Sequence, residues 1–64
     1  MISPDKILKT FLEEKITIRC KDVENIIGIL QGFDEHFNVA LQVEDKIHFI
    51  RGENIIHIAL NKTN

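Results

Sequence analysis

The 64-residue chain has a single cysteine and neither tryptophan nor tyrosine. The lone Cys20 excludes an internal disulfide, and one cysteine with three scattered histidines lacks the ligand spacing of a zinc site. A domain of this size buries only about 60% of the surface that its unfolded chain exposes, so its core alone gives marginal stability. Association with further copies is the remaining common means of stabilising so small a domain.

Long apolar runs are also absent. No stretch approaches the roughly 18 apolar residues of a membrane span, and the N-terminus lacks the basic-then-apolar layout of a secretory signal. We therefore expect a cytoplasmic protein without membrane contacts. The formal net charge is -2, with acids and bases interspersed along the chain. This balance argues against a broad cationic surface for nucleic acid, so any nucleic acid would bind at a local site.

The first residues carry the signals of a helix start. Ser3 can cap a helix, Pro4 suits the first helical position, and Asp5 interacts favourably with the positive end of the helix dipole. Four apolar residues then fall on one face at helical spacing, namely Ile7, Leu8, Phe11 and Leu12. The pattern predicts a helix over about residues 4–13. It is too short to be stable alone and must lie on an apolar surface.

Beyond residue 14 the hydrophobic period changes to two. It predicts strands at about residues 15–20, 25–33, 37–43, 46–51 and 54–60. Gly28 and Gly32 within the second strand indicate a bend, a bulge or a close backbone approach. The expected fold is therefore a single mainly-β domain over residues 1–64. A short N-terminal α-helix precedes a five-stranded, strongly bent antiparallel small barrel.

The last two predicted strands, "KIHFIR" and "NIIHIAL", are apolar at nearly every position. Strands that are apolar on both faces are normally covered on both sides. A monomer of this size has nothing with which to cover them, so we infer that they pair with or pack against a neighbouring subunit. Repeated head-to-tail pairing closes into a ring or continues as a filament.

Two stretches carry a family resemblance. "GILQGFDEHFNVAL" (28–41) and "IRGENI" (50–55) resemble the two signature motifs of the Sm and Sm-like (LSm) RNA-binding proteins. The archaeal type is most similar, because "IRG" differs from the second motif of bacterial Hfq and the link between the motifs is short. The chain departs from the family pattern in two places: the turn "KDVEN" lacks the common glycine, and Glu53 stands where aspartate is frequent.

The resemblance implies a ring of identical subunits, six to eight and most often seven, that binds U-rich single-stranded RNA at a central pore. It also implies a role as RNA scaffold or chaperone in RNA processing. In the implied site His36 and Arg51 cover the two faces of a base, Asn38 reads its edge, and the Gly52 backbone N–H approaches it. Two residues are assigned to support these four: Asp34, which orients the turn and holds Asn38, and Glu53.

The residue types suit this role. His36 and Asn38 are two positions apart, so in an extended chain they point the same way. An imidazole can stack on a base. The Asn38 amide offers a donor and an acceptor, which complement the O4 and N3–H of uracil. The planar Arg51 guanidinium can cover the second face of the base and neutralise a phosphate.

Simpler interpretations exist for the same residues. The Asp-Glu-His cluster at residues 34–36 could be a solvated turn, and Arg51 could be a salt-bridge partner of Asp34 or Glu53. Phe37 alternates with Val39 and Leu41, which favours a core position over base stacking. Two histidines in apolar strands and the lone cysteine are interpreted as structural, interface or buried groups, namely His48, His57 and Cys20.

Two other functions are alternatives to RNA binding. One is a ring-forming assembly scaffold with little RNA binding of its own. The other is an enzyme, for which the sequence gives little support, because neighbouring residues of an extended strand point in alternate directions and do not converge. No nucleophile with a base, phosphate-cradling glycine loop or metal set is found in the sequence. We therefore expect neither catalysis nor a cofactor.

Overall fold

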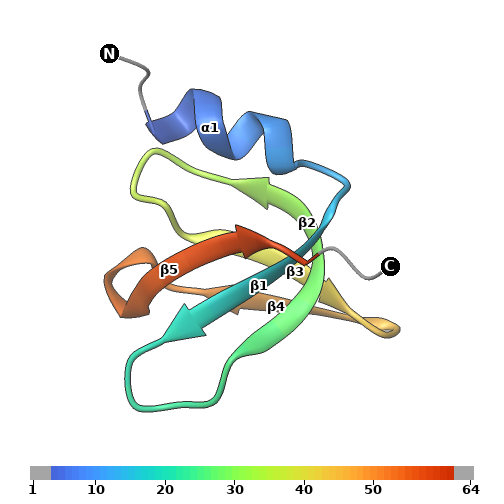
Figure 1. Ribbon diagram of the computed structural model, residues 1–64, viewed down its shortest axis with the longest axis vertical. Helices are drawn as coiled ribbons and strands as arrows, with labels where there is room; N and C mark the ends of the chain where they lie inside the picture. Colours follow the sequence, from blue (N-terminus) through green and yellow to red (C-terminus); the bar gives the residue numbers. More distant parts are fainter. Residues whose placement is uncertain (1–3, 62–64) are drawn as a thin grey trace.

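The computed structural model describes residues 4–61. One helix and five strands follow each other along the chain (Figure 1): α1 (Pro4–Phe11), β1 (Lys15–Cys20), β2 (Ile26–Phe33), β3 (Val39–Val43), β4 (Lys46–Ile50) and β5 (Ile55–Leu60). A short 3-10 helix, η1 (Gly52–Asn54), joins β4 to β5. No helix in this part of the chain is long and apolar enough to cross a membrane.

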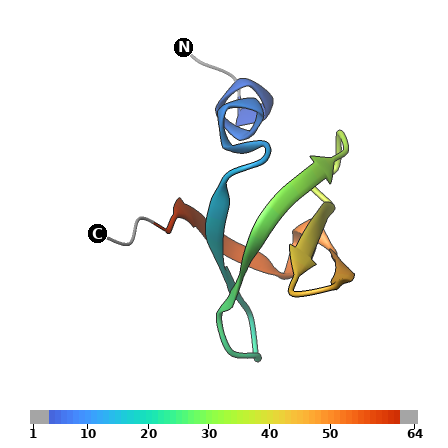
Figure 2. The ribbon, with the colours of Figure 1, turned by 90° about the vertical axis from the view of Figure 1, so that its right-hand side faces the viewer.

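The strands form one antiparallel sheet in the order β4-β3-β2-β1-β5. In the rotated view of Figure 2 the sheet is strongly bent, and α1 is seen nearly end-on above it. β4 and β5 are the outermost strands of the sheet, so each leaves one edge without a partner strand within the described chain. The predicted bent five-stranded sheet with its N-terminal helix is confirmed.

The bend of the sheet has local causes. The β2–β3 register shifts between Leu30 and Gly32, and the β1–β5 register shifts between Arg19 and Cys20. Such irregularities increase local twist and bend the strand that carries them. At Gly28, an added Cβ would press against the Gln42 carbonyl oxygen of β3. Glycine therefore allows β2 and β3 to approach closely at that point.

The core lies on the inner face of the bent sheet. Its fully buried side chains come from three strands, namely Ile16, Ile18, Leu30, Val39 and Leu41. The burial of β1 alternates strictly between its two faces, as a half-buried strand requires. Helix α1 adds the buried Leu8 and the partly buried Phe11. A helix of only 8 residues is therefore held by packing on this core.

Five predicted boundaries differ from the structure. Two differ by one residue, since β2 begins at residue 26 instead of 25 and β4 ends at residue 50 instead of 51. The helix ends at Phe11 instead of residue 13, because Glu13 adopts a left-handed backbone (φ 66°) and donates its N–H to the Leu30 carbonyl at 2.9 Å. The third strand begins at Val39 instead of residue 37, because the chain turns over residues 34–38. Residues 52–54 form η1, so the last strand begins at residue 55. The proposed helix cap, Ser3, lies outside the described residues.

Candidate functional site

The turn between β2 and β3 is organised by one carboxylate. The Asp34 Oδ1 accepts the backbone N–H of His36 at 2.8 Å and that of Asn38 at 3.0 Å. Its Oδ2 accepts a hydrogen bond from the Asn38 amide nitrogen at 3.0 Å. The backbone closes the same turn, because the Phe37 N–H donates to the Asp34 carbonyl at 3.0 Å. Asp34 thus fixes the position of both His36 and Asn38.

Phe37 occupies the centre of this turn with a positive φ of 61°. A bulky residue in the left-handed region is uncommon and persists only where the surroundings enforce it. Here the ring is partly buried and packs against the hydrophobic core, as the alternation pattern predicted, although residue 37 is not in a strand. The turn therefore carries its polar residues on a segment anchored to the core.

Asn38 connects this turn to the segment after β4. Its Oδ1 accepts the Gly52 backbone N–H at 2.8 Å while its Nδ2 donates to Asp34. Because one partner is a donor and the other an acceptor, the two bonds fix the orientation of the amide. One N–H of Nδ2 and one lone pair of Oδ1 stay available. This is the donor–acceptor pair that the uracil edge requires. Asn38 can therefore hydrogen-bond to a base while it keeps both of its bonds within the protein.

Gly52 has a different partner from the one expected. We predicted that its backbone N–H would approach a base, but that N–H is bonded to Asn38. The absence of a side chain serves another contact: an added Cβ would meet the His36 carbonyl oxygen and would lie 2.9 Å from the Phe37 carbonyl carbon. Glycine at residue 52 lets the two site segments touch through their backbones.

The two residues expected to cover the faces of a base are both exposed. The Arg51 Nε lies 3.3 Å from the Glu53 carboxylate, and the His36 Nε2 lies 3.5 Å from that of Glu35. The side chains of Arg51 and His36 each keep 76% of their surface in contact with solvent. Ion pairs this exposed contribute little to stability, so both side chains can reorient towards a ligand. Arg51 thus has the Glu53 partner that the simpler interpretation allowed.

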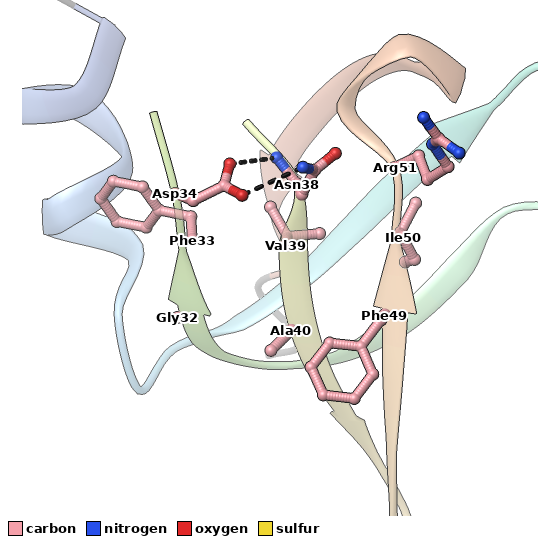
Figure 3. Close-up of a pocket in the computed structure, with 9 residues that line it drawn as sticks. All are labelled: Gly32, Phe33, Asp34, Asn38, Val39, Ala40, Phe49, Ile50 and Arg51. Atoms are coloured by element: carbon pink, nitrogen blue, oxygen red, sulfur yellow. Dashed lines mark hydrogen bonds between the residues drawn. The ribbon is translucent and has the colours of Figure 1, made fainter. Parts of the chain in front are cut away.

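A groove of about 540 Å³ runs beside these residues, between β2, β3 and β4. Figure 3 shows Asp34, Asn38 and Arg51 at one end of the groove, with Ala40 and Phe49 towards the other. The structure therefore brings three predicted site residues to one concavity. His36 does not line this groove and is tied to the cluster by its backbone N–H on Asp34.

Phe49 was not singled out from the sequence as a site residue. It is the most exposed large apolar residue of the described chain, at 83%, and it lies on the edge strand β4 two positions before Arg51. The sequence signal was an aromatic residue next to "IRG" in a strand that is apolar on both faces. From the sequence, we interpret this apolar strand as a contact with a neighbouring subunit, and the pattern does not indicate Phe49 in particular.

Electrostatics keep Asp34 ionised. The hydrogen bond from the Asn38 side chain, followed by those from the Asn38 and His36 backbones, holds the pKa of the Asp34 carboxyl below its usual value of 3.8. Desolvation acts in the opposite direction and is outweighed. The charged form that holds the turn together is thus the stable one at neutral pH. Among residues 4–61 no group of three or more His, Cys, Asp or Glu side chains is placed to hold a metal ion.

Comparisons with known proteins agree with this architecture. The family model described as the LSM domain matches residues 6–60. A protein of Encephalitozoon cuniculi described as a probable U6 snRNA-associated Sm-like protein is 41% identical over 64 aligned residues, which cover 91% of each chain.

Two solved structures share the fold. The SmAP1 heptamer of P. aerophilum superposes with a TM-score of 0.81 at 22% identity, covering 98% of this chain and 99% of that one. The Sm protein of Pyrococcus abyssii, whose structure is a complex with a uridine heptamer, superposes with a TM-score of 0.78 at 22% identity, covering 94% and 100%.

Proposed function

The chain belongs to the LSM-domain family, and on that premise we propose that it assembles into a ring that binds U-rich single-stranded RNA. The RNA site comprises His36, Asn38 and Arg51, together with Gly52, whose backbone N–H holds the Asn38 amide, and it is supported by Asp34 and Glu53. The ring acts as a scaffold or chaperone in RNA processing. The heptameric and uridine-bound relatives are precedents for this assembly and this ligand.

One observation carries the RNA-binding proposal. Asn38 is fixed by Asp34 on one side and by Gly52 on the other, and it retains one donor and one acceptor directed by that fixed amide. A positioned amide of this kind discriminates uracil, which offers O4 and N3–H, from cytosine, whose N4 amine donates where uracil accepts. Base stacking on His36 and Arg51 adds about 1–3 kcal/mol per base.

Ring formation follows from the two unpaired edges. β4 and β5 lie at opposite ends of the strand order and carry exposed apolar side chains, among them Ile47 and Phe49 on β4 and Ile56 and Leu60 on β5. Unlike edges at the two ends of one sheet pair head to tail, and a closed set of such contacts is a ring. Seven subunits is the expected number.

Fluorescence-anisotropy titration of the assembled ring with oligo(U) and oligo(C) at moderate salt tests the proposal, with native mass spectrometry to establish the assembly. We expect clear preference for oligo(U). A ring that binds neither oligonucleotide would favour the second function, an assembly scaffold with little RNA binding. We expect no RNA hydrolysis; turnover that is lost on changing Asp34 or His36 would contradict the non-enzymatic role.

A further inference from the structure

The outer face of the sheet has an uneven distribution of charge. In β1, Ile16, Ile18 and Cys20 are buried, whereas Lys15 and Arg19 are exposed on the opposite face. Lys21 directly follows β1 in a bend, is exposed as well, and is held beside η1 because its backbone N–H donates to the Asn54 carbonyl at 2.8 Å. Two cations thus lie on the outer face of β1, and a third follows the end of the strand. We call Lys15, Arg19 and Lys21 the β1 stripe.

The neighbouring strands do not neutralise the β1 stripe. On β5, His57 lies opposite Arg19, and on β2, Ile29 lies opposite Lys15. Between them Thr17 lies opposite Ile27 on one side and Ala59 on the other. None of these outward positions is an aspartate or a glutamate. The acidic residues next to β1 in sequence, Glu14 and Asp22, come before and after the β1 stripe.

The β1 stripe also has no ion pair. Within residues 4–61 the salt bridges are Glu35–His36 and Arg51–Glu53, and neither involves β1. A chain with a net charge of -2 therefore has a locally cationic face. The interspersed charges of the sequence had argued against such a surface. They conceal it because Glu14 and Asp22 flank the β1 stripe in the sequence, so acids and bases balance when they are counted along the chain.

We propose that the β1 stripe binds the phosphate backbone of RNA that extends beyond the segment held at the Asn38 site. This inference rests on the proposed function. Arg19 and Lys21 are two positions apart, which is roughly 6.6 Å in an extended chain, and Lys15 lies four positions before Arg19, which is roughly 13 Å. An extended polyanion can contact cations at both spacings. The positions that pair with the outward residues of β1 carry one aromatic ring, that of His57, beside Ile27, Ile29 and Ala59, so we expect most contacts to be with phosphates and to be largely independent of sequence.

The proposed assembly through the free edges would leave this face accessible. β1 lies between β2 and β5, so pairing through the free edges of β4 and β5 does not cover its outer face (Figure 1). Each subunit of a ring then presents one copy of the β1 stripe. An RNA strand that is already bound to one subunit has a raised effective concentration at the β1 stripes of the neighbouring subunits, so it gains further contacts there.

The test compares a short and a long RNA as a function of NaCl concentration. The short one is a uridine heptamer, and the long one is the same heptamer extended by an unstructured tail of about 25 nucleotides, a length that lets RNA already held at the Asn38 site reach neighbouring stripes. The variant Lys15→Gln/Arg19→Gln removes the two stripe cations that lie within β1. The matched control Lys6→Gln/Lys9→Gln removes two exposed cations from α1. Native mass spectrometry establishes that each variant forms the same ring as the wild type.

We expect the stripe variant to bind the heptamer like the wild type and the long RNA more weakly. The slope of log affinity against log salt for the long RNA should fall by about 1.4 for each subunit that the strand crosses, because each lost cation contributes about 0.7. The inference would be overturned by an equal loss of affinity in the control variant or by an equal loss of affinity for both RNAs. An unchanged affinity of the stripe variant for the long RNA would overturn it as well. Failure of the wild-type ring to bind the heptamer is a separate result, which overturns the proposed function.

Discussion

The Asn38 side-chain oxygen accepts a hydrogen bond at 2.8 Å from the backbone N–H of Gly52, a residue 14 positions further along the chain. This bond links the turn after β2 to the segment after β4. Strand β3 lies between β2 and β4, so the sheet itself does not pair these two strands with each other. Asp34 holds the other end of the same amide. The two sequence motifs are therefore parts of one bonded unit, and a change in either segment is expected to affect the other.

The contact at Gly52 predicts a steric requirement. An added methyl group in Gly52→Ala would meet backbone atoms of His36 and Phe37, which cannot move aside as a flexible side chain would. We expect a loss of about 1–3 kcal/mol in the free energy of unfolding, as for other overpacked sites. Chemical denaturation followed by circular dichroism measures it.

Gly32→Ala is the matched control, since a Cβ at that position has nothing within 4 Å. Neither glycine has a positive φ, so backbone conformation does not separate the two variants. We expect the control to change the free energy of unfolding by less than about 0.5 kcal/mol. Equal losses in both variants would contradict the close-contact role of Gly52.

The pKa of Asp34 predicts an acid-sensitive turn. Because the folded-state pKa lies below the usual value of 3.8, the ionised carboxylate stabilises the fold fully above that value. This contribution is lost as the pH falls through the lowered pKa. Asp34→Asn lacks it at every pH, so the difference in Tm between wild type and variant should be largest at neutral pH and shrink in strong acid.

Thermal melts from neutral to strongly acidic pH measure this difference. Glu35→Gln is the control, because the neighbouring carboxylate accepts none of the hydrogen bonds that hold the turn. The Tm of Glu35→Gln should change with pH in the same way as that of the wild type. A constant gap between wild type and Asp34→Asn at all pH values would show that the charge of Asp34 does not hold the turn.

The sequence patterns predicted where the strands lie, but they did not predict the geometry of the site. The period of two correctly predicted the strand at residues 15–20, in which Ile16 and Ile18 are buried, and it placed Leu41 in the core, because burial of one face imposes this period. The same rule was wrong at residues 36–38. It treated His36 and Asn38 as neighbours on an extended strand, whereas Phe37 has a positive φ and the segment is a turn.

The partner of Asn38 was also beyond sequence reasoning. An amide in a turn is compatible with many partners, and only the β2–β3–β4 arrangement brings the Gly52 N–H within reach. The glycine itself indicated a close backbone approach, without indicating what approached. In contrast, the role of Asp34 in holding a turn could be anticipated, because its bonds are made within four residues along the chain.

Arg51→Ala tests the stacking role separately from assembly. Arg51 is exposed and its ion-pair partner is Glu53, so the ring should form normally. Loss of a contact on one face of the base should weaken oligo(U) binding by about tenfold or more, given the 1–3 kcal/mol typical of base stacking. Glu53→Gln keeps the guanidinium and removes only the ion pair that supports it, so the affinity for oligo(U) should fall less than in Arg51→Ala. Equal effects of the two changes in an anisotropy titration would contradict stacking by Arg51.

Ile56→Asp tests the edge contact. Ile56 is 60% exposed on β5, so the charge does not disturb the core of the isolated subunit, but it would be buried where β5 meets the β4 edge of a neighbour. An unpaired charge in such a contact is strongly unfavourable. Native mass spectrometry should therefore detect monomers of the variant at concentrations where the wild type is a ring, with oligo(U) affinity reduced as a consequence.

Ile27→Asp provides the comparison for this experiment. Ile27 is 46% exposed on β2, an inner strand whose two edges are already paired with β1 and β3. The same charge placed there meets solvent in both the monomer and the ring, so we expect the ring to persist. If Ile27→Asp dissociates the ring as readily as Ile56→Asp, or if neither does, the subunits do not join through the β5 edge.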